Sequence, residues 1–195
     1  KHDWVGYGED NMYFKYLIDR YNGSPTNNAA INGIAEMIYG KGLEATDSED
    51  KPREYEKMKS LFKKDCMKKV CYDYKMMGQA SLQIIYSKDH SEIVEVSHIP
   101  VETLRAEKAS NGEIKAYYYS NDWEDVKPTD NLKRISAFGT SQDGIEILYI
   151  RPYRAGYYYY SPVDYQGGLQ YSELEEEIAK LDPSFYNHNK PFSYS

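Results

Sequence analysis

The sequence has very few residues that could hold a metal ion or form a disulfide. Cysteine occurs only at Cys66 and Cys71, and side chains five residues apart in a helix point roughly 140° away from each other. A disulfide between them is therefore not expected, and the pair indicates two partly buried thiols in a reducing compartment. The four histidines are scattered, with no His-x-x-x-His or Cys-x-x-Cys spacing. The sequence predicts neither a metal site nor a cofactor.

The chain also lacks long apolar runs and an excess of positive charge. No stretch reaches the roughly 18 apolar residues of a membrane helix, and no signal-peptide core is present. The glycosylation pattern at residues 22–24 is then a chance match, and an intracellular, soluble chain without a membrane partner is expected. The net charge of −7 argues against a surface that contacts phosphates broadly.

Catalytic patterns are missing as well. Residues 139–144 (GTSQDG) come nearest to a nucleophile elbow, but they lack the Gly-x-Ser-x-Gly frame. Residues 40–42 (GKG) have neither the spacing nor the following Ser or Thr of a phosphate-binding loop. The neighbouring acids Glu124 and Asp125 carry no information about glycoside chemistry. The sequence therefore predicts that the protein is not an enzyme.

Tyrosine, in contrast, is abundant: the chain has 22 tyrosines and an aromatic share of 15%. Each buried hydroxyl needs a hydrogen-bond partner, so a core of this size cannot take them all. Many are expected to be half-buried in sheet faces or to lie at a protein–protein surface. The residues predicted to form a subunit interface are Trp4, Tyr7, Tyr13, Tyr157, Tyr158, Tyr159, Tyr160 and Tyr165.

The segment 145–180 is the part around which the chain is organised. It begins as an apolar strand and continues through four consecutive tyrosines to an acidic helix that starts near Leu169. Pro152 and Pro162 punctuate the connection because proline has a fixed φ and no amide donor. The acidic helix is short, about twelve residues long, so its apolar side is underused. This segment is predicted to pack and not to react.

Three earlier segments have helical periodicity, at about 10–21, 27–39 and 52–77. The last is expected to be one long amphipathic helix. Its lysines allow two interpretations, contact with nucleic acid or an acidic partner, or the ordinary solvated face of a packed helix. These lysines are Lys57, Lys59, Lys63, Lys64, Lys68 and Lys69.

From Gln79 the apolar period changes from 3.6 to 2, which indicates strands. The pair Asn111-Gly112 predicts a hairpin between 104–108 and 114–119, because both residues tolerate positive φ. Further strands are expected at 80–86, 93–99, 133–138 and 145–150. The predicted class is α+β, an antiparallel β meander packed with a few helices.

We divide the chain into three parts on this basis: an aromatic N-terminal arm (1–26), an α+β domain (27–180) and an irregular C-terminal tail (181–195). The arm is expected either to dock on a neighbouring subunit or to lie over its own sheet. Because the chain begins at Lys1 and the helix near Leu169 is stopped at Pro183, a piece of a longer protein is one expectation. A short relative with altered function is the other.

Three stretches carry a resemblance to a known family. They are WVGYGEDN (4–11) with YNGSPTNN (21–28) and YGKGL (39–43); YKMMGQA (74–80) with HIP (98–100); and YRAG (153–156) through YYYSP (158–162) to Tyr165, GGL (167–169) and ELEEEIA (173–179). Together they span about 1–180. In these stretches the chain resembles the portal proteins of tailed bacteriophages, particularly those of phages or prophages of Bacteroides-like gut bacteria.

The resemblance implies a structural, non-enzymatic subunit of a ring of about twelve copies at one capsid vertex. Such a ring is the channel for DNA packaging and ejection, and its partners are the capsid, terminase and adaptor proteins. Double-stranded DNA passes without sequence specificity, and negative charge suits that passage because it adds no phosphate contacts. The implied location is the virion, and the bacterial host cytoplasm during assembly.

Two other functions remain open. The first is a phage adaptor or tail-associated interaction protein without catalytic activity. The second is an enzyme of nucleic-acid metabolism, which would need a Mg²⁺ site made of acids that converge in the fold. The candidate acids are Glu92, Glu95, Glu102 and Asp122.

Overall fold

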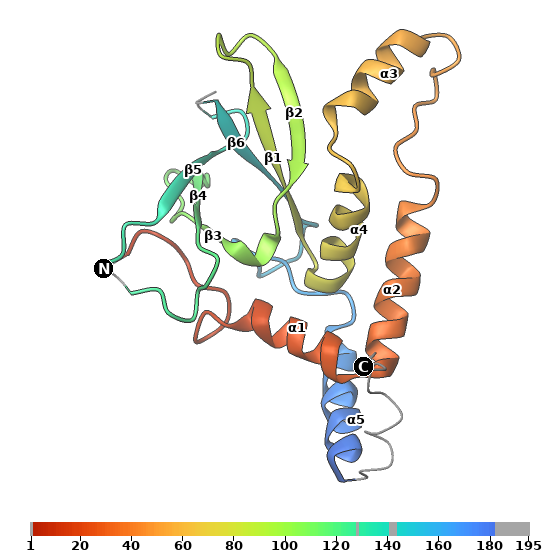
Figure 1. The fold of residues 1–195 in the computed structure, drawn as a ribbon. Coiled ribbons are helices and arrows are strands. Elements are labelled where there is room, and N and C mark those ends of the chain that lie inside the picture. The colour runs from red at the N-terminus through yellow and green to blue at the C-terminus, as the bar shows by residue number, and fades with distance from the viewer. Residues whose placement is uncertain (1, 128, 141–143, 182–195) are drawn as a thin grey trace, which may run out of the picture.

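The structure, a computed structural model, describes residues 2–127, 129–140 and 144–181. Helices lie around one twisted six-stranded sheet (Figure 1), which confirms the predicted α+β class. The predicted tail 181–195 lies outside the described residues, apart from Leu181.

The elements follow the local signals closely in most of the chain. The helices are α1 (Tyr13–Gly23), α2 (Pro25–Tyr39), α3 (Pro52–Leu61), α4 (Cys66–Met77) and α5 (Leu169–Leu181), with short 3-10 turns at Val101–Thr103 and Gln166–Gly168. The strands are β1 (Ala80–Tyr86), β2 (Ile93–His98), β3 (Leu104–Ala106), β4 (Ala116–Tyr119), β5 (Lys133–Ala137) and β6 (Ile145–Ile150).

The strand order is β2-β1-β6-β5-β4-β3, so the sheet is not one continuous meander. The last strand, β6, lies in the middle, antiparallel to β1 and parallel to β5. Its side chains explain this position, because Ile147 packs into the core on one face and Leu148 into the core on the other. A strand that is apolar on both faces is stable only where both faces are covered.

The expected single helix over 52–77 is wrong, because the chain forms two helices with a break between them. Phe62 has an extended backbone and Asp65 a left-handed one. The break residues join the edge of the sheet: Phe62 bridges to Val96, and the Lys63 N–H donates to the Val96 carbonyl at 3.0 Å. Hydrogen bonds to β2 therefore replace those of a continuous helix.

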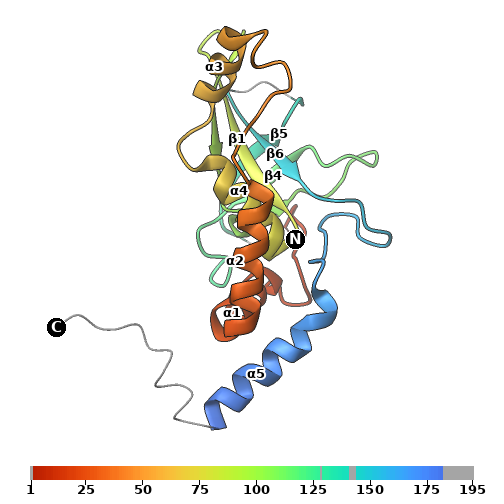
Figure 2. The same cartoon turned by 90° about the vertical axis from the view of Figure 1, so that its right-hand side faces the viewer.

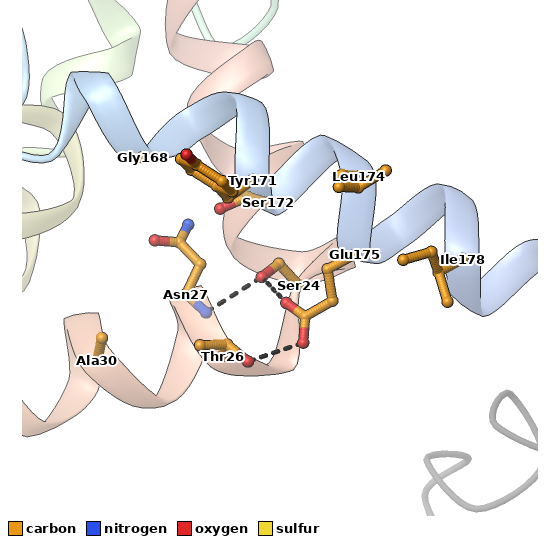
Figure 3. Close-up of a pocket in the computed structure, with 10 residues that line it drawn as sticks. All are labelled: Ser24, Thr26, Asn27, Ala30, Gly168, Tyr171, Ser172, Leu174, Glu175 and Ile178. Carbon is orange, nitrogen blue, oxygen red and sulfur yellow. Dashed lines mark hydrogen bonds between the residues drawn. The ribbon is translucent and has the colours of Figure 1, made fainter.

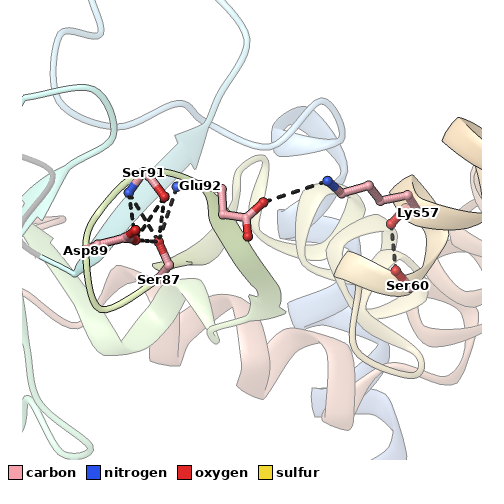
Figure 4. Close-up of polar contacts among 6 residues, drawn as sticks. All are labelled: Lys57, Ser60, Ser87, Asp89, Ser91 and Glu92. Atoms are coloured by element: carbon pink, nitrogen blue, oxygen red, sulfur yellow. Dashed lines mark hydrogen bonds and ion pairs between the residues drawn. The ribbon is translucent and has the colours of Figure 1, made fainter.

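The helix α3 is held on the surface, and none of its residues is buried. Figure 4 shows Lys57 of α3 reaching Glu92 beside the β1–β2 turn, with 3.7 Å between the charged atoms. That turn is held by hydrogen bonds of its own serine hydroxyls. The bonds from Ser87 and Ser91 lower the pKa of Asp89 to about 2.

Several other lysines of α3, α4 and the link between them also form ion pairs with acids. These pairs are Lys59 with Glu56, Lys63 with Glu95 and Lys68 with Glu36. This pairing supports the interpretation of a solvated face.

Two apolar clusters cover the two faces of the sheet. One lies between α4 and strands β1 and β2 and includes both Val70 and Leu82. The larger one takes Phe14 and Leu17 from α1, both almost completely buried. The arm also extends the sheet edge, since the Val5 N–H donates to the Ala106 carbonyl at 2.8 Å. Of the two alternatives for the arm, the structure shows the one in which it lies over its own sheet.

The predicted hairpin is confirmed. Asn111 and Gly112 have φ of 53° and 81°, and β3 and β4 pair antiparallel on either side of them. Both residues have the positive φ that this turn requires.

Candidate subunit interface

The tyrosine run 157–160 is fastened to the β3–β4 hairpin. Successive hydroxyls bond backbone groups three residues apart: Tyr160 with the Ala106 N–H (3.1 Å), Tyr159 with the Ala109 N–H (3.1 Å) and Tyr158 with the Gly112 carbonyl. The run therefore has a structural role within the chain. Tyr157 and Tyr158 are nevertheless 42% and 49% exposed, so these two residues keep surface that a partner could contact.

Tyr7 and Tyr160, both predicted interface residues, lie in the core. Their rings stack with centroids 4.5 Å apart, and the Tyr7 hydroxyl donates to the Ser161 carbonyl at 2.9 Å. Burial raises the pKa of Tyr160 to about 12. The two rings are only 8% and 5% exposed, so they join the arm to the C-terminal part of the chain and leave little surface for another copy.

Trp4, Tyr13 and Tyr165 are half-buried. Trp4 stacks on the His2 ring at 3.9 Å, and the Tyr165 hydroxyl donates to the Met76 carbonyl at 2.6 Å. Burial raises the pKa of Tyr165. For these residues, as for the rest of the tyrosine set, the role at an interface stays a prediction.

The structure also exposes apolar residues that the sequence did not single out. Tyr153 is 89% exposed, in the segment 151–158 that we call the arginine–tyrosine loop. A second set forms a stripe along α5, which we call the α5 stripe: Tyr171, Leu174, Ile178 and Leu181. These residues are spaced by three, four and three, so the helical period of the acidic segment was a signal that could have found them.

The opposite face of α5 is the one that packs against the rest of the chain. Leu169 and Ser172 are buried. The Tyr16 hydroxyl donates to the Glu173 carboxylate at 2.7 Å, and Arg20 pairs with Glu176 at 2.9 Å. Because α1 holds this face, the α5 stripe lies on the side of the helix away from α1, where Tyr171, Leu174 and Ile178 also line a groove beside α2. Figure 2 shows α5 running down and away from the sheet.

A groove of about 480 Å³ lies between α5 and the start of α2 (Figure 3). At its wall, Glu175 accepts hydrogen bonds from Ser24 and from the Thr26 hydroxyl at 2.7 Å. The same Ser24 oxygen caps α2 by accepting from the Asn27 N–H at 3.1 Å. Burial opposes ionisation of Glu175, but these hydrogen bonds outweigh it and lower its pKa. One carboxylate thus fixes α5 to the first turn of α2.

We expect Glu175→Gln to lower the free energy of unfolding by about 1 kcal/mol at pH 7, because two hydrogen bonds lose their charged acceptor. A carboxyl with a lowered folded pKa stabilises the fold above its ordinary value of 4.5, and this contribution is lost as the pH falls through the lower folded value. Urea unfolding at pH 7 and pH 3 measures both effects.

The matched control is Glu177→Gln, whose exposed carboxylate pairs with Lys180 on the same helix. Its expected cost is much smaller than that of Glu175→Gln, because water and salt screen a fully exposed ion pair. An equal loss in the two variants, or a Glu175→Gln loss that persists unchanged at pH 3, contradicts the proposed link between α5 and α2.

The two exposed surfaces carry opposite charge. The helix α5 has four glutamates, Glu173, Glu175, Glu176 and Glu177, against the single cation Lys180. The arginine–tyrosine loop has two arginines, Arg151 and Arg154, and no acid.

The four acids considered for a Mg²⁺ site do not gather in one place: Glu102 and Asp122 line a pocket beside Trp123, apart from the other two. Glu92 and Glu95 face Lys57 and Lys63 at the edge of the sheet. Among the residues that the structure describes, no three His, Cys, Asp or Glu side chains are close enough to hold a metal ion. Within the same residues, every helix is too short or too polar to cross a lipid bilayer.

The structure is an α+β domain with exposed apolar side chains along α5 and in the arginine–tyrosine loop. No protein-family model matches the sequence, and no curated protein does. Solved structures do match the fold. A chain from the neck of an empty GTA particle computed with C6 symmetry gives a TM-score of 0.70 at 12% identity, over 97% of this chain and 49% of that one.

Two further structures agree. The neck of a native GTA particle computed with C12 symmetry gives a TM-score of 0.68 at 11% identity, over 97% of this chain and 48% of that one. The virion of the native gene transfer agent (GTA) particle gives 0.65 at 11% identity, over 92% and 46%. The chain thus shares its fold with components of gene transfer agent particles, and it spans about half the length of the chains it matches.

Proposed function

We propose that this protein is a structural subunit of a portal-type ring at the capsid vertex of a tailed phage or prophage of Bacteroides-like bacteria. The observation that carries the proposal is the fold, which matches chains from particle necks computed with C6 and C12 symmetry over 97% of this chain. The ring forms the channel for DNA packaging and ejection, and the protein has no catalytic activity of its own. Its partners are further copies, the capsid, the terminase and an adaptor.

The charge of the chain supports this role. A net charge of −7 gives passing DNA few cations to bind, and fixed cations in a channel would add phosphate contacts and slow the DNA. The exposed aromatic and aliphatic side chains of the arginine–tyrosine loop and α5 are the kind of surface that contacts between subunits bury.

A second candidate is an adaptor or tail-associated ring protein. The fold comparison supports it as well, because the matched chains come from particle necks. Pull-down with the large terminase separates the two: a portal-type subunit retains the terminase, whereas an adaptor retains the portal ring.

Ring assembly is tested by size-exclusion chromatography with light scattering and by negative-stain microscopy of the purified chain. We expect multimers whose population rises with concentration. Tyr158→Asp should weaken this association at least tenfold, since it places a charge on a half-exposed aromatic at the interface, and should shift Tm by about 3 °C or less.

The control is Phe138→Asp, which places the same charge on a side chain of similar exposure at the end of β5. It should leave association unchanged. Two outcomes would exclude an interface at Tyr158. One is a large fall in Tm that accounts for the loss of association in Tyr158→Asp. The other is an equal weakening of association by Phe138→Asp.

A further inference from the structure

The α5 stripe is an apolar helix face that the other described residues leave largely exposed. Leu181 is 84% and Tyr171 75% exposed, and Leu174 and Ile178 are each more than half exposed. The groove beside the stripe continues it toward α2, where Ala30 and Thr26 form the other wall (Figure 3). Four large apolar side chains in one row on a projecting helix indicate a surface for a partner.

The charges beside the stripe restrict what can cover it. Glu175 and Glu177 lie on its two sides, and the helix carries one lysine against four glutamates. Two α5 helices packed stripe to stripe would bring these carboxylates together, which electrostatic repulsion opposes. The same carboxylates repel a nucleic-acid backbone. The occupant is therefore expected to combine apolar area with positive charge.

The arginine–tyrosine loop has this combination. Tyr153 and Arg154 are both exposed just before the turn at Ala155–Gly156, and Tyr153 is the most exposed large apolar residue described in the chain. Tyr157 adds a half-exposed ring on the same segment. Tyrosine and arginine are also the residues that most often dominate the binding energy of interfaces, since both supply area and directed polar groups.

We propose that the α5 stripe of one copy binds the arginine–tyrosine loop of the next copy. This pairing rests on the proposed ring function and names its two contacting surfaces. Because stripe and loop are different parts of the chain, the contact is head-to-tail, which is the kind of contact that closes into rings of more than two subunits. Tyr153 lies between the aliphatic side chains, and Arg154 faces the α5 carboxylates.

The test uses two variants that each remove one surface. The stripe variant carries Leu174→Ser with Ile178→Ser, and the loop variant carries Tyr153→Ser with Arg154→Glu. All four side chains are exposed, so both variants should fold with a Tm near that of the wild type. The control variant carries Met37→Ser with Ile38→Ser, two exposed apolar residues at the end of α2.

Light scattering should show concentration-dependent multimers for the wild type and the control. Each variant alone should associate at least tenfold more weakly. An equimolar mixture of the two variants should give a species of two chains and no larger one. One intact loop then meets one intact stripe, and the other ends of that pair are blocked.

The outcomes separate this pairing from the ring proposal. If the wild type associates but either variant alone associates equally well, or if the mixture stays monomeric, the pairing is overturned while the ring stands. If the control loses association as the variants do, the contact is not specific and the pairing is overturned too. A wild type that remains a monomer at every concentration overturns both.

Discussion

Replacing Gly78 with alanine is expected to lower the free energy of unfolding by about 3 kcal/mol, or Tm by roughly 9 °C. Gly78 ends α4 with a left-handed backbone, φ 72° and ψ 2°. A Cβ atom there would lie 2.6 Å from the Pro162 carbonyl oxygen and 2.9 Å from its carbon. The Pro162 carbonyl belongs to the backbone and cannot rotate away as a side chain could. The C-terminal segment around Pro162, which crosses the α4–β1 junction, must therefore shift.

That crossing is itself held by buried polar groups, so a shift has further cost. The Gln79 side-chain oxygen accepts from the Ser161 N–H at 3.2 Å and from the Tyr149 hydroxyl at 3.1 Å. Moving residues 161–163 would weaken the first of these bonds.

Gly139→Ala separates the two contributions. Gly139 also has a left-handed φ of 83°, but no atom of the described residues lies within 4 Å of the position of its Cβ. Gly139→Ala should lower the free energy of unfolding only by the cost of a left-handed backbone at alanine, about 1 kcal/mol. Chemical denaturation of both variants measures the difference, and equal losses would show that the contact with Pro162 relaxes without cost.

Substituting Arg105 by methionine should also lower the free energy of unfolding by about 3 kcal/mol. This is expected although the arginine makes no ion pair at hydrogen-bonding distance among the described residues. Arg105 is 2% exposed. Its guanidinium donates to the Asn11 side chain and carbonyl and to two further backbone carbonyls, and lies over the Phe14 and Trp123 rings at 5.1 and 4.7 Å.

Two effects of Arg105→Met on the free energy of unfolding act in opposite directions, and the larger one decides whether the variant is less or more stable. Burial lowers the pKa of Arg105 to about 10, so the fold bears a cost for keeping this cation, and methionine removes that cost. Methionine also leaves buried carbonyls without a hydrogen-bond donor. It removes the bonds to Asn11, which hold the turn where this residue has a φ of 67°. Several charge-assisted hydrogen bonds of about 1.5 to 3 kcal/mol each outweigh the relief.

The control is Arg134→Met. Arg134 forms a two-point ion pair with Glu107 at 2.6 and 2.8 Å, but at the surface. Its loss should cost below about 1 kcal/mol. A thermal melt in which Arg134→Met lowers Tm more than Arg105→Met would contradict the larger stabilising role that we assign to the buried Arg105.

The parts of the fold that short stretches of sequence decide were predicted well. The helix expected at about 27–39 forms as α2 (Pro25–Tyr39), and its first turn is capped by the Ser24 hydroxyl, which accepts from the Asn27 N–H. Asn111-Gly112 makes the hairpin turn, and the acidic segment forms α5 over Leu169–Leu181. In each case the residues that form the bond or adopt the special φ are neighbours in the chain.

The break between α3 and α4 could not be predicted in this way. The apolar period continues through Phe62, so the local signal favours one helix. What ends it is Val96, which lies 34 residues further along and supplies a backbone acceptor at the sheet edge. The central place of β6 has the same kind of cause, since it depends on both β1 and β5 being formed.

By itself, the sequence determined the α+β class, the main turns, the excess of tyrosine over what a core can hold, and the acidic balance, because these follow from composition and local spacing. Only the tertiary structure decided which aromatics are free to meet another chain. Tyr7 and Tyr160 stack inside, whereas Tyr153 and the α5 stripe face outward. Exposure is set by what distant segments cover, and no local pattern contains that information.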